Sequence, residues 1–562
     1  MACDQFSVFH RRVEKTPPVR PDAAVADIIV VGAGAAGMVA AIAAAKAGAS
    51  VILLEKAEQL GGTAAVSGGI VWAPMNHHID PADPDDREAA LAYFGALEGG
   101  DLRGDVLAGF VDHAAAAIAF IEANSRLRFA VLPGYPDYYI DRPGARPQGG
   151  RALDSGLFPY SELGEWRDRV AVATAYPLAL AETPLGGATT MPAPEVMAAR
   201  IARDERGFGQ SLVAGLLEAC LATGVDIRLG ARVTGLAQVA GRITGVDIMA
   251  VDGPQQLAAR RGVIVTTGGF EWNAELARSF LRGPIAHPAS PPTNTGDGLR
   301  LLMAAGADLG NMTSAWWCPT IVTEQTWGDG SPRAVPVLIE RTLPGSIIVN
   351  ARGQRFCNEA VNYSAIAGAF HAFDPGSYSY ANLPAWLVFD HDYKLRNAVA
   401  TALPGSDVPD WMITAPDLPS LAARLGMAGD PLTPTVARFN AGATRGEDRD
   451  FGRGASEYDR FYGDRSRPGS LATLGPLAAV PFYAVPLHMG ALGTNGGART
   501  DDHGRVLGHD GAPIPGLYAA GNVMAAPTGG IYAGAGGTLG PALTYGWLAG
   551  RTAAASNFDG VA

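Results

Sequence analysis

The stretch DIIVVGAGAAG, residues 27–37, decides the fold class of this chain. It opens with a short β-branched run that suits a buried parallel strand. A GxGxxG pattern follows, and an alanine-rich helical stretch begins directly after it. In such a turn Gly32 permits the tight bend, Gly34 lets a pyrophosphate approach the backbone, and Gly37 lets the helix pack closely against the strand. The helix start also offers unpaired N–H groups to that pyrophosphate.

A second strand and an acidic residue complete this unit. The run Ser50–Leu54 ends at Glu55, which is placed to accept hydrogen bonds from an adenosine ribose. A purely structural glycine turn is the alternative, but strand, helix, second strand and terminal acid together favour a dinucleotide site. The long apolar segment that starts at Ile28 resembles a membrane span in composition. Glycines and Lys46 interrupt it, so strand–turn–helix–strand explains it better.

A second cluster of small residues after the acid predicts a larger cofactor. Glu55 is followed by Lys56, then by 61–63 (GGT) and 67–69 (SGG). With this EKxxxxGGTxxxSGG continuation the chain resembles the FAD-binding fold of the fumarate reductase flavoprotein superfamily, and the resemblance implies FAD in an extended conformation. Families that link the flavin covalently use a histidine near this loop. Ala64 and Ala65 stand in that region here, so we expect noncovalent FAD.

Composition bounds the remaining possibilities. Apolar residues make up 48% of the 562 residues, and the net charge is -12, which argues for a core-rich globular protein and against a nucleic-acid surface. Cys3, Cys220, Cys318 and Cys357 form no CxxC motif, so we expect reduced thiols in a cytoplasmic protein. The first 25 residues lack the apolar core of a signal peptide. We expect no integral membrane segment; a weak peripheral membrane contact stays open.

The order of motifs predicts an α/β protein: a Rossmann-like FAD-binding domain in two sequence segments, with an inserted α+β substrate-capping domain. The expected parts are a polar extension (1–25), the first FAD-binding segment (26–315), the catalytic or capping domain (316–484) and the second FAD-binding segment (485–562). Within the first segment the expected elements are helices over 86–124 and 210–223, strands over 226–229, 242–250 and 263–267, and a hairpin at 240–241. A further helix is expected from Thr538.

Two conspicuous clusters receive ordinary interpretations. The charged run 447–460 is expected to be a solvated surface of the cap. His77 and His78 could suggest a metal pair. Adjacent residues of an extended segment point to opposite faces, however, and no third ligand is evident, so we expect no metal.

Two arginines of the fumarate reductase pattern are missing from this chain, and their absence narrows the range of expected substrates. The segment 340–363 (ERTLPGSIIVNARGQRFCNEAVNY) resembles that pattern through GxRFxNE, which carries an arginine proton donor at the position of Tyr363. Fumarate reductases place a second arginine in the carboxy-terminal loop, where this chain has YAGAGG. With both arginines missing, fumarate and succinate are not expected substrates.

The whole pattern resembles another branch, the 3-ketosteroid Δ1-dehydrogenases, from Asp27 to Leu548. The matching stretches are GYPDYY (134–139), AWWCPT (315–320), ERTLPGSIIVN (340–350), GQRFCNEAVNY (353–363), GTNGGARTDDHGRVL (493–507), GLYAAGNV (516–523) and YAGAGGTLGPALTYG (532–546). The resemblance implies an FAD-dependent desaturase of a cyclic ketone, with a 3-ketosteroid at the 1,2 position as the leading substrate and an external electron acceptor.

The resemblance assigns the catalytic roles to Tyr138, Tyr363, Tyr532 and Gly536. Tyr532 and the Gly536 N–H would donate to the ketone oxygen as an oxyanion hole, while Tyr363, assisted by Tyr138, would remove the α-proton. Because a free tyrosine has a pKa near 10, the tyrosine pair and a nearby helix dipole would have to lower the pKa of Tyr363. Without the resemblance, each tyrosine would be an ordinary packing residue.

Motifs and resemblance together assign the cofactor-binding residues. They are Gly32, Gly34, Ala35, Ala36, Gly37, Glu55, Lys56, Gly61, Gly62, Thr63, Ser67, Gly68, Gly69, Val233, Thr267, Gly268, Gly269, Asn294, Gly296, Asp297, Gly298, Gly521, Asn522, Gly537, Thr538 and Leu539. The glycines 534, 536 and 537 are expected to let the backbone approach flavin and substrate.

Two departures from the branch leave the substrate open. Gly530 and Ile531 precede Tyr532, where the branch commonly has histidine and threonine, and the region 151–200 matches poorly. Desaturation of another ring ketone, or 4,5-dehydrogenation of a 5α-steroid, is therefore the close alternative. A reductase working in the reverse direction and a catalytically silent flavoprotein are the more distant ones.

Overall fold

The computed structural model describes residues 24–97, 99, 102–172 and 176–556. The expected N-terminal extension therefore lies outside the described residues, apart from Ala24 and Val25, which open the first strand. Cys3 also lies outside them. The described cysteines Cys220, Cys318 and Cys357 are buried free thiols, as the sequence predicts.

A mostly parallel sheet forms the first half of the molecule, with the strand order β22-β23-β11-β1-β2-β8. β1 (Ala24–Val31) lies between β2 (Val51–Leu54) and β11 (Gly253–Val265) and is parallel to both. β8 (Asp226–Arg228) continues the sheet beyond β2, and β23 (Pro513–Ala519) and β22 (Arg505–Leu507) continue it beyond β11. The β-branched run in β1 is fully buried because helices cover it, as in other parallel sheets.

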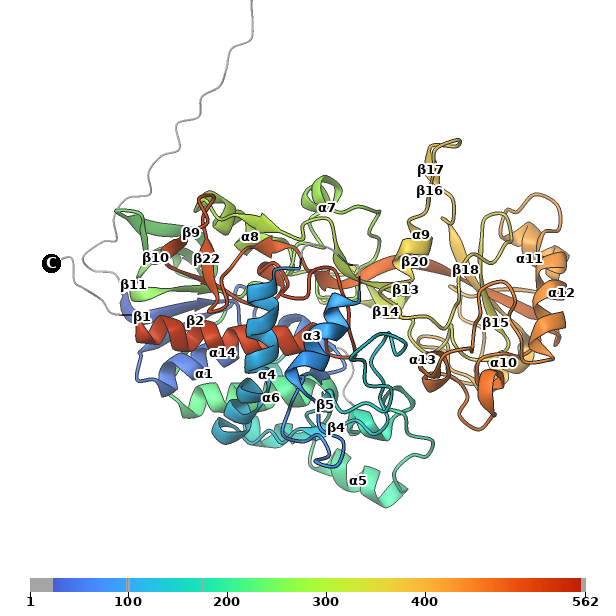
Figure 1. Ribbon diagram of the computed structural model, residues 1–562, viewed down its shortest axis with the longest axis horizontal. Helices are drawn as coiled ribbons and strands as arrows, with labels where there is room; N and C mark the ends of the chain where they lie inside the picture. The colour runs from blue at the N-terminus through green and yellow to red at the C-terminus, as the bar shows by residue number, and fades with distance from the viewer. Residues whose placement is uncertain (1–23, 98, 100–101, 173–175, 557–562) are drawn as a thin grey trace, which may run out of the picture.

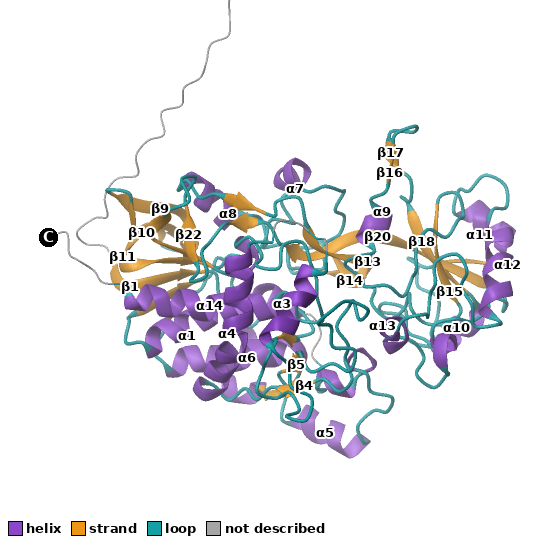
Figure 2. Cartoon of the chain, viewed as in Figure 1, coloured by secondary structure: helices purple, strands orange, loops and turns teal. Residues whose placement is uncertain are grey.

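β9 (Arg232–Val239) and β10 (Arg242–Ala250) form the expected hairpin, which pairs with β11. Ala240 and Gly241 both have positive φ at its turn. Helices α1 (Ala35–Lys46), α4 (Gly104–Asn124), α6 (Phe208–Ala222) and α14 (Leu539–Ala555) lie together along one side of the sheet (Figures 1 and 2). The helical pattern over 86–124 is thus divided between α3 (Arg87–Gly95) and α4.

The carboxy-terminal helix packs closely on the amino-terminal one. A Cβ at Gly546 would lie 2.5 Å from the Ala36 carbonyl oxygen, and one at Gly550 would lie 2.3 Å from that of Ala40. Only glycine allows the helices to approach this closely, so the last segment of the chain returns to the dinucleotide turn. The described residues include one helix, α4, that is long and apolar enough to cross a bilayer. Half of it is buried in the protein, and core helices satisfy the same criteria.

A second, antiparallel sheet builds the other half, with the order β14-β13-β20-β18-β15. Its strands are β13 (Ala315–Thr326), β14 (Pro332–Pro336), β15 (Ser346–Asn350), β18 (Ala385–Phe389) and β20 (Phe482–Thr494), and β19 (Ile413–Ala415) also pairs with β20. The expected domain boundary at 484/485 falls inside β20, which pairs with both β13 and β18. The division into domains stays a prediction.

The remaining elements are short and lie mostly around these sheets (Figure 1). They are α2 (Gly62–Val66), β3 (Val71–Trp72), β4 (Ala130–Val131), β5 (Ala152–Asp154), β6 (Phe158–Pro159), α5 (Pro194–Ala202), β7 (Glu205–Arg206), α7 (Ala274–Phe280), α8 (Asp297–Ala304), β12 (Leu309–Gly310), α9 (Ala367–Phe370), β16 (Phe373–Asp374), β17 (Ser379–Tyr380), α10 (His391–Arg396), α11 (Leu418–Arg424), α12 (Leu432–Ala443), α13 (Glu457–Phe461) and β21 (Gly497–Ala498), with 3-10 helices at Tyr160–Arg169, Leu180–Glu182, Pro184–Gly186, Gly469–Ala472 and Gly521–Val523.

The charged run 447–460 is not simply a solvated surface, and this expectation is wrong for part of it. Arg355 bridges Glu359 (2.7 Å) and Asp448 (2.8 Å), and Arg453 reaches Glu359 at 3.3 Å. At most 4% of each side chain is exposed. Burial acts to raise the pKa of Glu359, but the two arginines outweigh it, and the net shift is downward. Asp448 pairs with Arg355 and Arg453 with Glu359, both far away in sequence, and local charge density does not reveal such pairs.

We predict that Glu359→Gln destabilises the protein far more than a matched change at the surface. Removing the carboxylate takes from the buried Arg453 its one ion-pair partner among the described residues, at a cost of about 3–5 kcal/mol. Asp450→Asn breaks the pair with Arg438, whose side chain is 74% exposed, and should cost less than about 1 kcal/mol. Calorimetric melting of both variants checks this. Equal melting temperatures would contradict the importance of the buried network.

Candidate active site

One continuous cavity of about 1500 Å³ joins the two halves of the protein. It is larger than the ~300–1,000 Å³ of common ligand pockets, so it has room for a dinucleotide and a second small molecule. Tyr138, Tyr363, Tyr532 and Gly536 all line it. So do most of the expected cofactor residues, namely Gly32, Gly34, Ala35, Ala36, Glu55, Lys56, Gly61, Gly62, Thr63, Ser67, Gly68, Gly69, Val233, Thr267, Gly268, Asn294, Asp297, Gly521, Asn522, Thr538 and Leu539.

The glycine turn between β1 and α1 has the geometry that the sequence predicts. Gly32 has φ of +104°, and a Cβ there would lie 2.6 Å from the Thr266 carbonyl oxygen. A Cβ on Gly37 would lie 2.0 Å from the Gly32 carbonyl oxygen, so Gly37 supports packing rather than lining the cavity. At Gly34 a Cβ would meet nothing within 4 Å. The space beside Gly34 is therefore open to a ligand at the N-terminus of α1.

Glu55 and Lys56 connect this turn to its surroundings. The N–H groups of Ala33 and Ala57 each donate to the Glu55 carboxylate at 3.0 Å. Burial raises the pKa of Glu55 despite these two hydrogen bonds. Lys56 donates to the Thr295 hydroxyl at 2.8 Å and pairs with Asp297 at 3.1 Å. Two motifs far apart in sequence thus meet at one edge of the cavity.

Five expected cofactor residues do not line the cavity: Gly37, Gly269, Gly296, Gly298 and Gly537. They support the residues that do. A Cβ on Gly298 would lie 2.0 Å from the Thr267 hydroxyl, and one on Gly269 would lie 2.3 Å from the Glu271 carboxylate. Glu271, which the sequence did not single out, accepts from Ser290 (2.6 Å) and Asn294 (2.7 Å). The five glycines were assigned through their sequence motifs, and those motifs contain both residues that line the cavity and residues that allow close backbone packing.

The three expected catalytic tyrosines come from distant segments and form one buried cluster. The Tyr138 hydroxyl donates to the Tyr363 hydroxyl at 3.1 Å. The rings of Tyr138 and Tyr532 are stacked, with centroids 5.6 Å apart, and the rings of Tyr363 and Tyr532 meet edge to face at 5.4 Å. Trp316 and Tyr458 close the cluster. The neighbours Tyr135 and Tyr139 instead contact Tyr462 and Asn362.

Burial, rather than activation, sets the pKa of these phenols in the structure. Desolvation raises the pKa of Tyr363 well above 10, although the hydrogen bond from Tyr138 acts to lower it. Desolvation likewise raises the pKa of Tyr138 and Tyr532. We expected the pKa of Tyr363 to be lowered, and this expectation is wrong, because the net shift is upward. The hydrogen bond has the expected sign, but loss of water around the ring is the larger effect.

The glycine loop before α14 is shaped chiefly by Trp72. Cβ atoms on Gly534 and Gly536 would lie 2.4 Å and 2.5 Å from Trp72 nitrogen atoms. The Trp72 backbone N–H donates to the Gly536 carbonyl oxygen at 3.2 Å. Among the described residues no protein oxygen accepts from the Gly536 N–H, so this group is available to a ligand in the cavity. Gly534 thus makes room for the Trp72 indole and Gly536 for the Trp72 backbone, which we did not expect.

A buried ion network holds Trp72 and the segment that carries Tyr138. Trp72 Nε1 donates to Asp137 at 2.8 Å, and Arg151 bridges Asp137 (2.8 Å) and Asp85 (2.6 Å). None of these three ionic side chains is more than 3% exposed. Sequence reasoning missed the network because its members lie in three separate segments. The arginine itself opens the region that we described as poorly matched.

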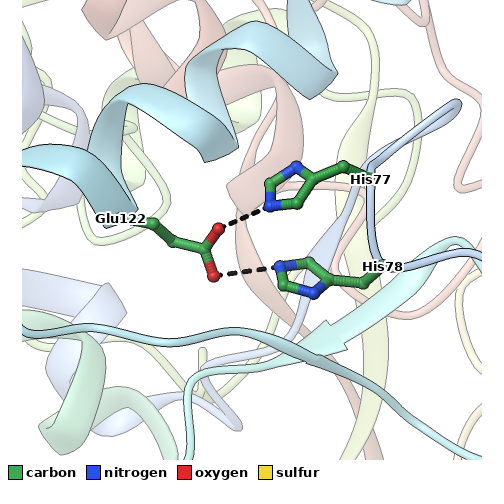
Figure 3. A group of neighbouring side chains, drawn as sticks. All are labelled: His77, His78 and Glu122. Atoms are coloured by element: carbon green, nitrogen blue, oxygen red, sulfur yellow. Dashed lines mark hydrogen bonds and ion pairs between the residues drawn. The ribbon is translucent and has the colours of Figure 1, made fainter.

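His77 and His78 do not diverge, so the geometric reason given for dismissing them is wrong. Both rings point to Glu122, with Nε2–O distances of 2.7 Å and 2.9 Å (Figure 3). The Ile79 N–H donates to the Asn76 carbonyl oxygen, so the backbone turns here and is not extended. The third residue lies 44 positions beyond His78, on α4.

The residues of the cavity fit a flavin dinucleotide. The open space beside Gly34 is where a pyrophosphate would lie against the start of α1. The Thr267 hydroxyl is buried without a hydrogen-bond partner and lines the same cavity. Such an unsatisfied group calls for a ligand.

Comparison with known proteins identifies the family. Residues 27–539 match the family described as FAD binding domain. A 4-oxocyclohexanecarboxylate 2-dehydrogenase of Sinomonas cyclohexanicum is 41% identical over 95% of this chain and 94% of its own length. A 3-oxosteroid 1-dehydrogenase of Mycobacterium tuberculosis is 38% identical over 93% of this chain and 97% of its own length. The crystal structure of 3-ketosteroid Δ1-dehydrogenase from Sterolibacterium denitrificans has a TM-score of 0.85 and 35% identity, and the match covers 95% of this chain and 100% of that one.

The chain belongs to the 3-ketosteroid Δ1-dehydrogenase family. The family resemblance drawn from the motifs is confirmed, as are the α/β FAD-binding fold, FAD as the cofactor and oxidoreductase activity. A flavocytochrome c3 fumarate reductase shares the fold, with a TM-score of 0.59 at 22% identity. That the FAD of this family member is held noncovalently stays a prediction.

We predict that Gly34→Val abolishes FAD binding without unfolding the protein. The new side chain has room in the protein and needs no positive φ, but it occupies the space where the pyrophosphate would lie. FAD affinity should fall by more than about tenfold, a change of 1.4 kcal/mol. Gly104→Val, at another open glycine that begins α4, is the matched control. The measurement is FAD titration of the apoprotein, with circular dichroism to confirm folding. Unchanged FAD affinity would contradict the assignment of the turn.

Proposed function

We propose that this protein desaturates a ring ketone between its α and β carbons, with a 3-ketosteroid, attacked at the 1,2 position, as the leading substrate. One observation carries the proposal: the Tyr138–Tyr363 hydrogen bond and the Tyr532–Gly536 loop line the same cavity as the dinucleotide turn. The 3-oxosteroid 1-dehydrogenases among the relatives and the neighbouring structure, which is a complex with 1,4-androstadiene-3,17-dione, support this choice of substrate.

The carbonyl oxygen would be held by two donors. Tyr532 and Gly536 lie on one loop, and both residues line the cavity. As negative charge develops on the oxygen, two preorganised donors in a dry site stabilise it more than water would. The desolvation that raises the pKa of Tyr532 serves this role, because a donor must keep its proton. Polarising the carbonyl makes the α-hydrogen acidic.

The α-proton would pass to Tyr363. Tyr138 donates to its oxygen, so the hydrogen bond stabilises the ionised form of Tyr363 and not that of Tyr138. Bound FAD supplies the acceptor for the β-hydride. The substrate thus loses one proton and one hydride, and a carbon–carbon double bond forms. An external electron acceptor would then oxidise the reduced cofactor.

A smaller ring ketone that carries a carboxylate is the second candidate, and Arg333 favours it. Arg333, on β14, lines the cavity together with Ala334, Val335 and Pro336. Its guanidinium lies 5.3 Å from the centre of the Trp327 ring, and burial lowers its pKa. Arginine remains charged even so, and it suits a carboxylate. The relative that is 41% identical is named for such a substrate.

We predict that Tyr363→Phe abolishes flavin bleaching by a ring ketone and leaves the yellow cofactor bound. Losing the proton acceptor should cost about 10²–10⁴ in rate. Tyr458→Phe is the matched control, because the Tyr458 hydroxyl is buried in the same cluster and has no hydrogen-bond partner. Anaerobic stopped-flow mixing with 4-androstene-3,17-dione and with cyclohexanone derivatives measures the rate.

The bleaching rate of the wild-type protein should also rise with pH between about 6 and 9, because a raised pKa leaves Tyr363 protonated at neutral pH. Bleaching by Tyr363→Phe at the wild-type rate would remove Tyr363 from this role, and absence of bleaching by any ketone would refute the proposed function.

The two substrate candidates predict different effects of replacing Arg333. If a carboxylated ring ketone is the substrate, Arg333→Met should lower kcat/KM for 4-oxocyclohexanecarboxylate by about 10–100-fold, the worth of a charged hydrogen bond. The same change should leave turnover of 4-androstene-3,17-dione within about threefold. A wild-type protein that turns over only the steroid would exclude the second candidate.

A further inference from the structure

Two histidines and a glutamate meet outside the cavity and have no role in the proposed chemistry. His77 and His78 follow β3, and Glu122 lies in the last turn of α4 (Figure 3). None of the three lines the cavity. With one candidate ligand atom taken from each residue, a ring nitrogen of each histidine and a carboxylate oxygen, the three atoms all lie within 4.8 Å of one another.

The loop is held in the shape that brings the two imidazoles together. The buried Asn76 side chain donates to the carbonyl oxygens of Ala73 (2.8 Å) and Gly150 (2.9 Å). Its own oxygen accepts from the His78 N–H at 3.1 Å. The ring centroids of His77 and His78 are 4.1 Å apart. The two imidazoles are therefore positioned by a buried amide rather than by chance contact at the surface.

A backbone hydrogen bond orients the Glu122 carboxylate. The Phe129 N–H donates to its Oε1 atom at 2.8 Å, which leaves Oε2 directed at His77. Only 11% of the Glu122 side chain is exposed, whereas 46% of His77 is. A carboxylate fixed by a backbone N–H beside an exposed imidazole offers both a ready ligand and a path of entry.

We propose that His77, His78 and Glu122 bind one divalent ion of the zinc class. Two imidazole nitrogens and one carboxylate oxygen are three of the four ligands of such an ion, and water supplies the fourth. Ligand atoms of tetrahedral zinc lie about 3.4 Å apart, so the imidazoles of His77 and His78, now 2.7 Å and 2.9 Å from the carboxylate, must move away from it by about 0.7 Å and 0.5 Å. Mg²⁺ and Ca²⁺ prefer oxygen ligands throughout and do not suit the pair of imidazoles.

The site is structural rather than catalytic. Bound metal ties the loop after β3 to the end of α4. β3 contains Trp72, which contacts the glycine loop beside Tyr532, so the ion stiffens the support of the active site without touching substrate.

Isothermal titration of tag-free, chelator-treated holoenzyme with Zn²⁺ tests the proposal. We expect one ion per chain, an increase in melting temperature with Zn²⁺, and no response to Mg²⁺. His78→Ala and Glu122→Gln should each weaken Zn²⁺ binding by at least about tenfold. The Gln amide oxygen can still accept from Phe129, which preserves the fold.

His503→Ala is the matched control, because His503 is similarly exposed (48%) and lies near one acid, Asp502, at 3.6 Å. The affinity of the His503→Ala variant for Zn²⁺ should equal that of the wild-type protein. Retained FAD content shows that each variant is folded, and His77→Ala, at the most exposed ligand, gives an independent test should another variant lose FAD. Absence of saturable binding in the wild type, or unchanged affinity in Glu122→Gln and His77→Ala, would overturn the proposal.

Discussion

Trp72 is the side chain on which the arrangement of the site depends. It is 1% exposed, and three glycines of the carboxy-terminal segment approach it closely: a Cβ on Gly534 would lie 2.4 Å from the indole nitrogen, and one on Gly536 or Gly540 would lie 2.5 or 1.9 Å from the Trp72 backbone nitrogen or oxygen. Its Nε1 atom donates to Asp137, the residue before Tyr138. The backbone and the indole of one residue therefore fix the loop that carries Tyr532 and Gly536 relative to the segment that carries Tyr138. Any larger residue at these glycines would separate the two.

The same burial creates the chemical problem that the site has to solve. Dry surroundings strengthen donors such as Tyr532 and Gly536, but they also disfavour a phenolate at Tyr363. The polarity of the hydrogen bond between Tyr138 and Tyr363 distinguishes the two phenols: the first gives its proton to the bond, and the second accepts it. The bond from Tyr138 favours the ionised form of Tyr363, whereas burial and the hydrogen bond between Tyr363 and Tyr532 both raise the pKa of Tyr363.

Sequence predicted what depends on local spacing and missed what depends on distant partners. The turn at Gly32–Gly37, the hairpin at Ala240 and the helix after Thr538 follow from residues within one segment. Arg151 and its two acids, and the pairing of Asp448 with Arg355, join separate segments, and no local pattern marks them. The four catalytic assignments came from the family resemblance. The structure places those residues together, which composition and periodicity could not do.

The arrangement also explains why related enzymes can share chemistry and differ in substrate. The reacting groups are confined between Trp72, the Tyr138 segment and the loop before α14, where glycine contacts and buried ions leave little freedom. Another part of the cavity is lined by β14 and by Leu338 and Tyr462, where Arg333, Leu338 and Tyr462 contribute side chains of very different character. Under the proposed function, a change in that second group would alter which ring ketone is held without moving a reacting atom. Under the proposed function, the cationic Arg333 would bear on substrate choice, and the tyrosine cluster would bear on the reaction.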